Sequence, residues 1–99
     1  MSTSEVELAR REGSEFRSVQ LQLQADGGLC MHAFDKGATA TLTFDREDYE
    51  FWVTVPAHAV GQLAFELMRE RFDGRLQAVT EFRDFCKRHE IVNEFSTRT

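Results

Sequence analysis

Residues 18–25 alternate polar and apolar side chains without interruption, and this alternation limits the possible fold more than any other feature. The apolar members are Val19, Leu21, Leu23 and Ala25. A period of two places all four on one face of a β-strand. Asp26-Gly27-Gly28 follows, and glycine adopts positive φ without steric cost, so a hairpin turn is expected there. The pattern therefore predicts an antiparallel sheet.

Three more strands are expected before residue 56. They are predicted over Leu29–Phe34, Ala38–Phe44 and Tyr49–Val55, with turns at Asp35-Lys36-Gly37 and Asp45–Asp48. Connections this short favour antiparallel neighbours, because a parallel pair needs a long crossover. The four strands are therefore expected to form a meander.

The second part of the chain has helical periodicity. Pro56 cannot donate to a strand ladder but suits the first turn of a helix. One helix is predicted from there to about Phe72, where Asp73-Gly74 provides a stop, and a second over about Arg75–Glu90. We expect an α+β fold in two layers: a four-stranded antiparallel β-meander followed by a helical hairpin packed on one sheet face.

The length of 99 residues suits one domain. Residues 16–92 are predicted to form it. Residues 1–15 are a polar N-terminal segment, in which the capping box at Ser4–Glu7 predicts a short helix and a flexible tail is the alternative. Residues 93–99 are expected to be a C-terminal tail or a short edge strand.

The charge distribution restricts the partners. The chain has a net charge of −5, and residues 1–55 hold 5 basic and 10 acidic side chains. A nucleic-acid backbone requires a basic face, and the sequence offers none, so nucleic-acid binding is not expected. A basic protein partner is electrostatically permitted. No signal peptide or membrane span is recognised, and two cysteines make no disulfide framework, so we expect a cytoplasmic protein.

The sheet face opposite the helices is the candidate binding surface. Strand parity places Thr41, Glu50 and Trp52 on it. The strand at 29–34 is ambiguous, since its two faces are about equally apolar. If Leu29, Met31 and Ala33 face the helices, then Cys30, His32 and Phe34 join Trp52 on the outer face. An aromatic centre on a flat polar face is typical of an interaction site, and we expect a homodimer. The alternative is that Trp52 packs under the N-terminal segment or lies flat across neighbouring threonine side chains.

The sequence gives little indication of a metal site or of a catalytic site. Cys30 with His32, and Cys86 with His89, could supply four zinc ligands, but the preferred parity turns the first pair away from the second helix. No metal and no cofactor are therefore expected. No nucleophile, phosphate-loop or metalloprotease motif is present. Arg71 lies within the apolar stripe of the first helix and is a possible clamp for an anionic ligand.

The leading functional hypothesis is a small acidic, non-enzymatic interaction module that self-associates through this sheet face. One alternative is a ligand-binding protein or enzyme with a pocket at the sheet–helix rim, near His32, His58 and Arg71. Another is an acidic inhibitor or immunity-type protein that binds a basic partner.

Overall fold

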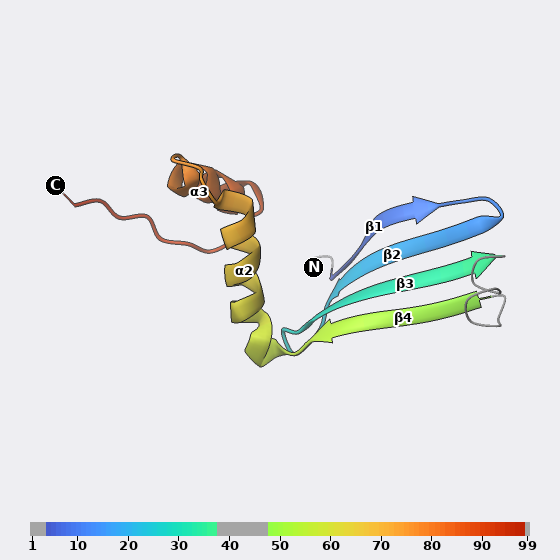
Figure 1. The fold of residues 1–99 in the computed structure, drawn as a ribbon. Coiled ribbons are helices and arrows are strands. Elements are labelled where there is room, and N and C mark those ends of the chain that lie inside the picture. The colour runs from blue at the N-terminus through green and yellow to red at the C-terminus, as the bar shows by residue number, and fades with distance from the viewer. Residues whose placement is uncertain (1–3, 38–47, 99) are drawn as a thin grey trace. The chain divides into compact units, whose positions relative to one another are not determined.

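The computed structural model describes residues 4–37 and 48–98. Four strands come first: β1 (Glu5–Arg11), β2 (Glu15–Leu23), β3 (Leu29–Gly37) and β4 (Asp48–Val55). They form one antiparallel sheet in the order β1-β2-β3-β4 (Figure 1). Two helices follow, so the predicted α+β order of four antiparallel strands and then two helices is confirmed. The predicted strand over Ala38–Phe44 lies outside the described residues.

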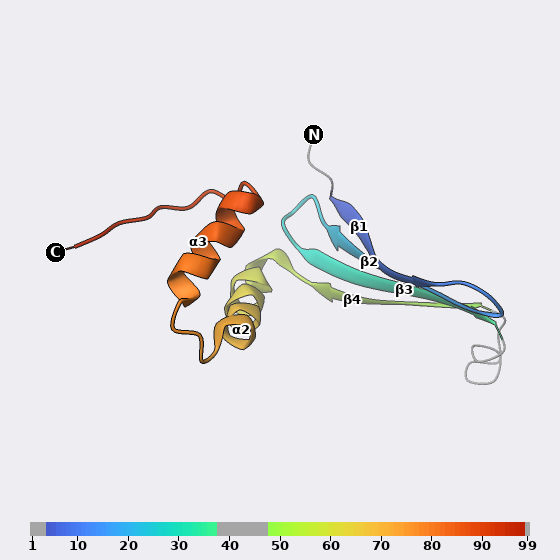
Figure 2. The same cartoon turned by 90° about the horizontal axis from the view of Figure 1, so that it is seen from above.

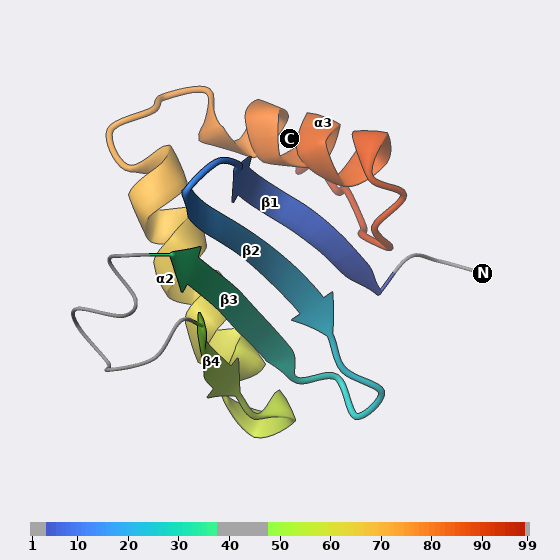
Figure 3. The ribbon, with the colours of Figure 1, turned by 90° about the vertical axis from the view of Figure 1, so that its right-hand side faces the viewer.

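The register of the three later strands follows the alternation in the sequence. Leu21 is opposite Met31, which is opposite Val53, and the next residues over, Gln20, His32 and Trp52, form a second row. Opposed residues share a sheet face, so the ambiguity of β3 is resolved. Leu29, Met31 and Ala33 lie on the face of Leu21, and Cys30, His32 and Phe34 lie on the other. Figure 3 shows the sheet from a direction in which all four strands can be followed.

Strand β1 departs from the prediction. Residues 5–11 pair with β2 instead of forming the short helix or flexible tail expected from the capping box. The turn at Gly13 has φ of 118°, a conformation that glycine adopts most readily, and it returns the chain into β2. The ladder is interrupted between Glu7 and Ala9, where a β-bulge shifts the register by one residue.

The helices lie close to their predicted positions. A 3-10 turn, η1 (Ala57–Ala59), follows Pro56 and leads into α2 (Val60–Phe72), and α3 spans Ala78–Arg88. Gly74 has φ of 74° in the tight connection between α2 and α3, which Figure 2 shows from above. Helix α3 begins three residues after the predicted start at Arg75, because residues 75–77 still belong to the turn. Residues 93–99 are predicted as a tail or short edge strand, and the described part of this segment, residues 93–98, contains no strand.

The chain divides into two compact units, residues 1–64 and 65–99. In the described part of the first unit the buried residues are Ser18 on β2, Gly28 in the turn before β3, and Cys30 and Ala33 on β3. In the second unit Cys86 of α3 is buried, and the rings of Phe72 and Phe82 meet edge to face with centroids 6.0 Å apart. Within the described residues, no helix has the length and apolar content needed to cross a membrane.

Candidate interaction face

The sheet has two faces of different chemistry. We call one the polar–aromatic face; its central members are Gln20, Gln22, Cys30, His32, Phe34, Glu50, Trp52 and Thr54. The other is the apolar face; its members include Val19, Leu21, Met31, Ala33, Phe51 and Val53. The division follows from the period-two alternation of β2, β3 and β4, which the register keeps aligned across all three strands.

Trp52 and His32 form the centre of the polar–aromatic face, and Glu50 lies beside them toward the start of β4. The His32 ring stacks on the Trp52 indole, with centroids 4.9 Å apart and planes at 13°. The Nε2 atom of His32 lies 3.1 Å from Oε2 of Glu50. The imidazole is therefore held on two sides, and it fixes the orientation of the indole. Trp52 itself remains 56% exposed.

The rest of the face is organised by contacts between neighbouring strands. Phe16 and Phe34 meet edge to face with centroids 6.1 Å apart, and the Arg10 guanidinium lies 5.1 Å from the centre of the Phe16 ring. Ser18 is buried, and its Oγ atom has no hydrogen-bond partner within residues 4–37 and 48–98. At the other end, the Thr54 hydroxyl donates to Sγ of Cys30 at 3.5 Å. These contacts make a surface of ordered side chains.

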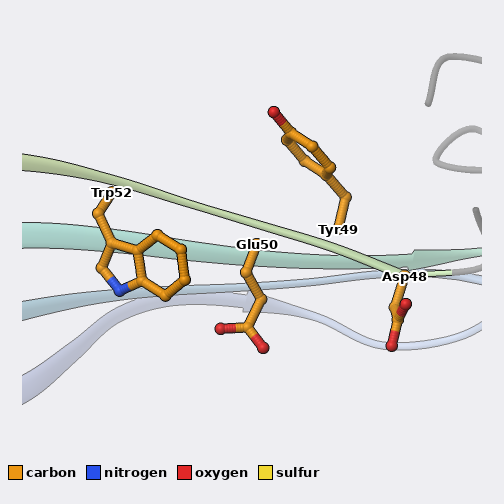
Figure 4. Close-up of a pocket in the computed structure, with 4 residues that line it drawn as sticks. All are labelled: Asp48, Tyr49, Glu50 and Trp52. Atoms are coloured by element: carbon orange, nitrogen blue, oxygen red, sulfur yellow. The ribbon is translucent and has the colours of Figure 1, made fainter.

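An acidic hollow adjoins Trp52 at the start of β4. It has a volume of about 400 Å³ and is lined by Asp48, Tyr49, Glu50 and Trp52. Figure 4 shows that Asp48, Glu50 and Trp52 project to the same side of the strand, whereas Tyr49 projects to the opposite side. The two carboxylates and the indole edge thus give this end of the face a negative, aromatic character.

Charge on the sheet is distributed differently on its two faces. On the polar–aromatic side, Arg10 of β1 forms an ion pair with Glu7, with Nε and Oε1 3.0 Å apart. On the apolar side, Arg17 makes a two-pronged ion pair with Asp35. The hydrogen bonds from Arg17 lower the pKa of Asp35 below its ordinary value, with a smaller contribution from the charges of Arg17 and Arg11. This second pair stabilises the β2–β3 register.

The sequence-predicted site residues are partly brought together. Trp52, His32, Phe34 and Glu50 share the polar–aromatic face, as strand parity required. Thr41 lies outside the described residues. Arg71 belongs to α2 in the second unit, where it lines a separate hollow.

Sequence reasoning missed the contribution of β1 and the first residues of β2. Glu7, Arg10 and Phe16 all contribute to the polar–aromatic face. Alternation of Glu5 and Glu7 with Val6 and Leu8 was the signal that could have revealed β1.

The four candidate zinc ligands are divided between the two compact units. Cys30 and His32 are on β3 in the first unit, whereas Cys86 and His89 are at the end of α3 in the second. His32 already contacts Glu50, and His89 packs against Phe85 with ring centroids 4.4 Å apart. Across residues 4–37 and 48–98, no group of three or more His, Cys, Asp and Glu side chains could hold a metal ion.

Comparisons of the chain with protein-family models, with curated proteins and with solved structures gave no match. The geometry of the polar–aromatic face is therefore the basis on which a role is assigned.

Proposed function

We propose that the protein is a small, non-enzymatic interaction module that self-associates through its polar–aromatic face. The observation that carries the proposal is the exposure of Trp52, 56%, at the centre of an ordered sheet surface. A large aromatic side chain gains from losing water, and here stacking on His32 has already fixed its orientation. A partner that covers Trp52 therefore gains apolar burial at a low cost in side-chain entropy.

The composition of the face supports an interface. Aromatic side chains and uncharged amides or hydroxyls occupy the middle, and charged groups lie at the β1 side and at the start of β4: Glu7, Arg10, Asp48 and Glu50. Stable interfaces combine a core depleted in charge and enriched in aromatic residues with a polar rim. The apolar face, rich in valine, leucine and methionine, instead resembles a protein interior.

The dimensions of the face limit the size of the interface that it can form. Four strands spaced about 4.8 Å apart and about eight residues long make a surface of roughly 500 Å² in projection. The low end of specific interfaces is about 600 Å² for each partner. The face in projection falls slightly below this limit, so we expect a weak, reversible dimer with a dissociation constant in the micromolar range.

Sedimentation velocity over a concentration series tests the proposal. The wild type should shift from monomer to dimer between about 1 and 200 μM, within the span typical of such interfaces. Trp52→Ala should remain monomeric over the same series, with an unchanged far-ultraviolet circular dichroism spectrum.

Val53→Thr is the matched control. Val53 is the next residue on β4, has nearly the shape of threonine, and points to the apolar face. It should dimerise as the wild type does. A monomeric wild type at 200 μM would refute self-association. Loss of the dimer in Val53→Thr but not in Trp52→Ala would show that the interface is on the apolar face.

The acidic hollow favours a second candidate, a module that binds a basic protein. Asp48 and Glu50 beside Trp52 suit a lysine or arginine side chain, which gains from both a carboxylate and an aromatic ring. Pull-down from a native lysate should then retain a stoichiometric basic protein that 0.5 M salt releases, and Glu50→Gln should weaken its capture. A lysate without such a protein would leave self-association as the proposal.

A further inference from the structure

A second hollow lies in the helical hairpin and is formed entirely by the second compact unit. It has a volume of about 180 Å³. Its lining residues are Leu67, Met68, Arg71, Phe72, Phe82 and Phe85. The edge-to-face pair of Phe72 and Phe82 contributes two of its walls. An apolar cavity of about 150 Å³ is enough to hold benzene, so this hollow has room for about six carbon atoms.

Among the described residues, Arg71 is the only charged side chain that lines this hollow. Its neighbours in sequence are neutralised: Arg69 forms an ion pair with Glu66, and Arg75 holds Glu81 in a two-pronged ion pair. Within the part of the chain that the structure describes, Arg71 has neither a hydrogen bond nor an ion pair, and its charge acts on Glu81 only as a secondary influence that lowers the pKa of that carboxyl. The guanidinium is thus available for an external anion.

We propose that this hollow binds a small carboxylate with an apolar tail of about six carbons, its head group on Arg71 and its tail against the phenylalanine rings. A purely apolar occupant would fill the space but would leave the guanidinium without a counter-charge. A small inorganic anion would satisfy Arg71 but would leave the ring surfaces exposed. A carboxylate amphiphile satisfies both, and it pairs with a guanidinium in a two-pronged geometry. This site is independent of the sheet-face proposal.

Titration of the full-length, isotope-labelled protein with hexanoate, followed by NMR, tests the site. The methyl signals of Leu67 and Met68 should shift and saturate in the low millimolar range. Hexan-1-ol, which has the same tail and no charge, should bind at least tenfold more weakly. Acetate, which has the head group alone, should produce no saturable shift. Each methylene added between butanoate and hexanoate should tighten binding about fourfold.

Two variants separate the head group from the tail. Arg71→Gln should weaken hexanoate binding by about 10- to 100-fold and leave hexan-1-ol unchanged, because only the charged contact is lost. Arg69→Gln, on the same helix but outside the hollow, is the matched control and should bind hexanoate as the wild type does. Absence of a saturable shift with hexanoate, equal binding of hexan-1-ol, or full binding by Arg71→Gln would each overturn the proposal.

Discussion

The imidazole of His32 lies nearly parallel to the indole of Trp52, with ring centroids 4.9 Å apart, because the two residues are directly opposite each other on β3 and β4. We predict a coupling of about 1 kcal/mol between His32→Ala and Trp52→Ala in a double-mutant cycle, since each substitution removes the same stack. Urea unfolding of dilute, monomeric protein measures it. A cycle of His32→Ala with Val53→Ala is the control and should be additive, since Val53 is on the opposite face.

The ion pair of Arg17 with Asp35 should make stability depend on pH. The pair lowers the pKa of Asp35 in the folded state, so its stabilisation is present above the ordinary aspartate pKa and is lost as the pH falls through the folded-state value. We expect Asp35→Asn to lower the free energy of unfolding by under about 1 kcal/mol at pH 7, because Arg17 is well exposed.

The difference between Asp35→Asn and the wild type should shrink from about pH 5 downward and vanish at the acid end of the series. Urea unfolding at a set of pH values between 2 and 7 measures it. A constant difference across this range would show that Asp35 contributes nothing through its charge.

Substitution by alanine should change the stability of the protein in opposite directions at Gly37 and at Gly61. Gly37 has φ of 130°, and an added Cβ would overlap the carbonyl oxygen of Ser14, so Gly37→Ala should cost about 2 kcal/mol or more. Gly61 lies in α2 with open space around it, and Gly61→Ala should stabilise the protein by about 0.5 kcal/mol. Thermal unfolding of both variants beside the wild type provides the measurement.

Phe82 should contribute more to stability than Val79, another apolar residue on α3. Its ring packs against Phe72 and is 36% exposed, so Phe82→Ala should lower the free energy of unfolding by about 2 kcal/mol, less than for a fully buried ring. Val79→Ala, at a position 73% exposed, should change it by under about 0.5 kcal/mol. Equal losses at the two positions would contradict the packing of the hairpin.

The register of the sheet centre could be predicted because alternation leaves little choice. Once Leu21 is assigned to one face, the period of two assigns every other residue of β2, and a slip of one residue would exchange all its apolar and polar side chains between the two faces. β1 could not be predicted with the same ease. Its sequence carries a capping signal at Ser4 and only two alternating apolar residues, Val6 and Leu8, and its strand state depends on pairing with β2.

In the candidate sites too, patterns within one element could be predicted from the sequence, whereas contacts between elements could not. Parity placed Trp52, Glu50, His32 and Phe34 on one face, but the stack of His32 on Trp52 needs the exact pairing of β3 with β4. Arg71 was recognised in an apolar stripe, whereas the rings of Phe82 and Phe85 beside it come from a different helix. Contacts between elements are set by turn geometry, which single-residue patterns describe only weakly.

The bulge in β1 has a consequence for how copies of this protein can assemble. A regular outer strand is a template onto which another chain can add a strand, and every addition exposes a fresh template, so growth has no natural end. The register shift between Glu7 and Ala9 breaks the repeat of outward backbone groups, and Arg10 and Arg11 add charge beside it. In the dimer proposed above, by contrast, each copy would cover the polar–aromatic face of the other, so this assembly would stop at a closed pair instead of extending into a fibre.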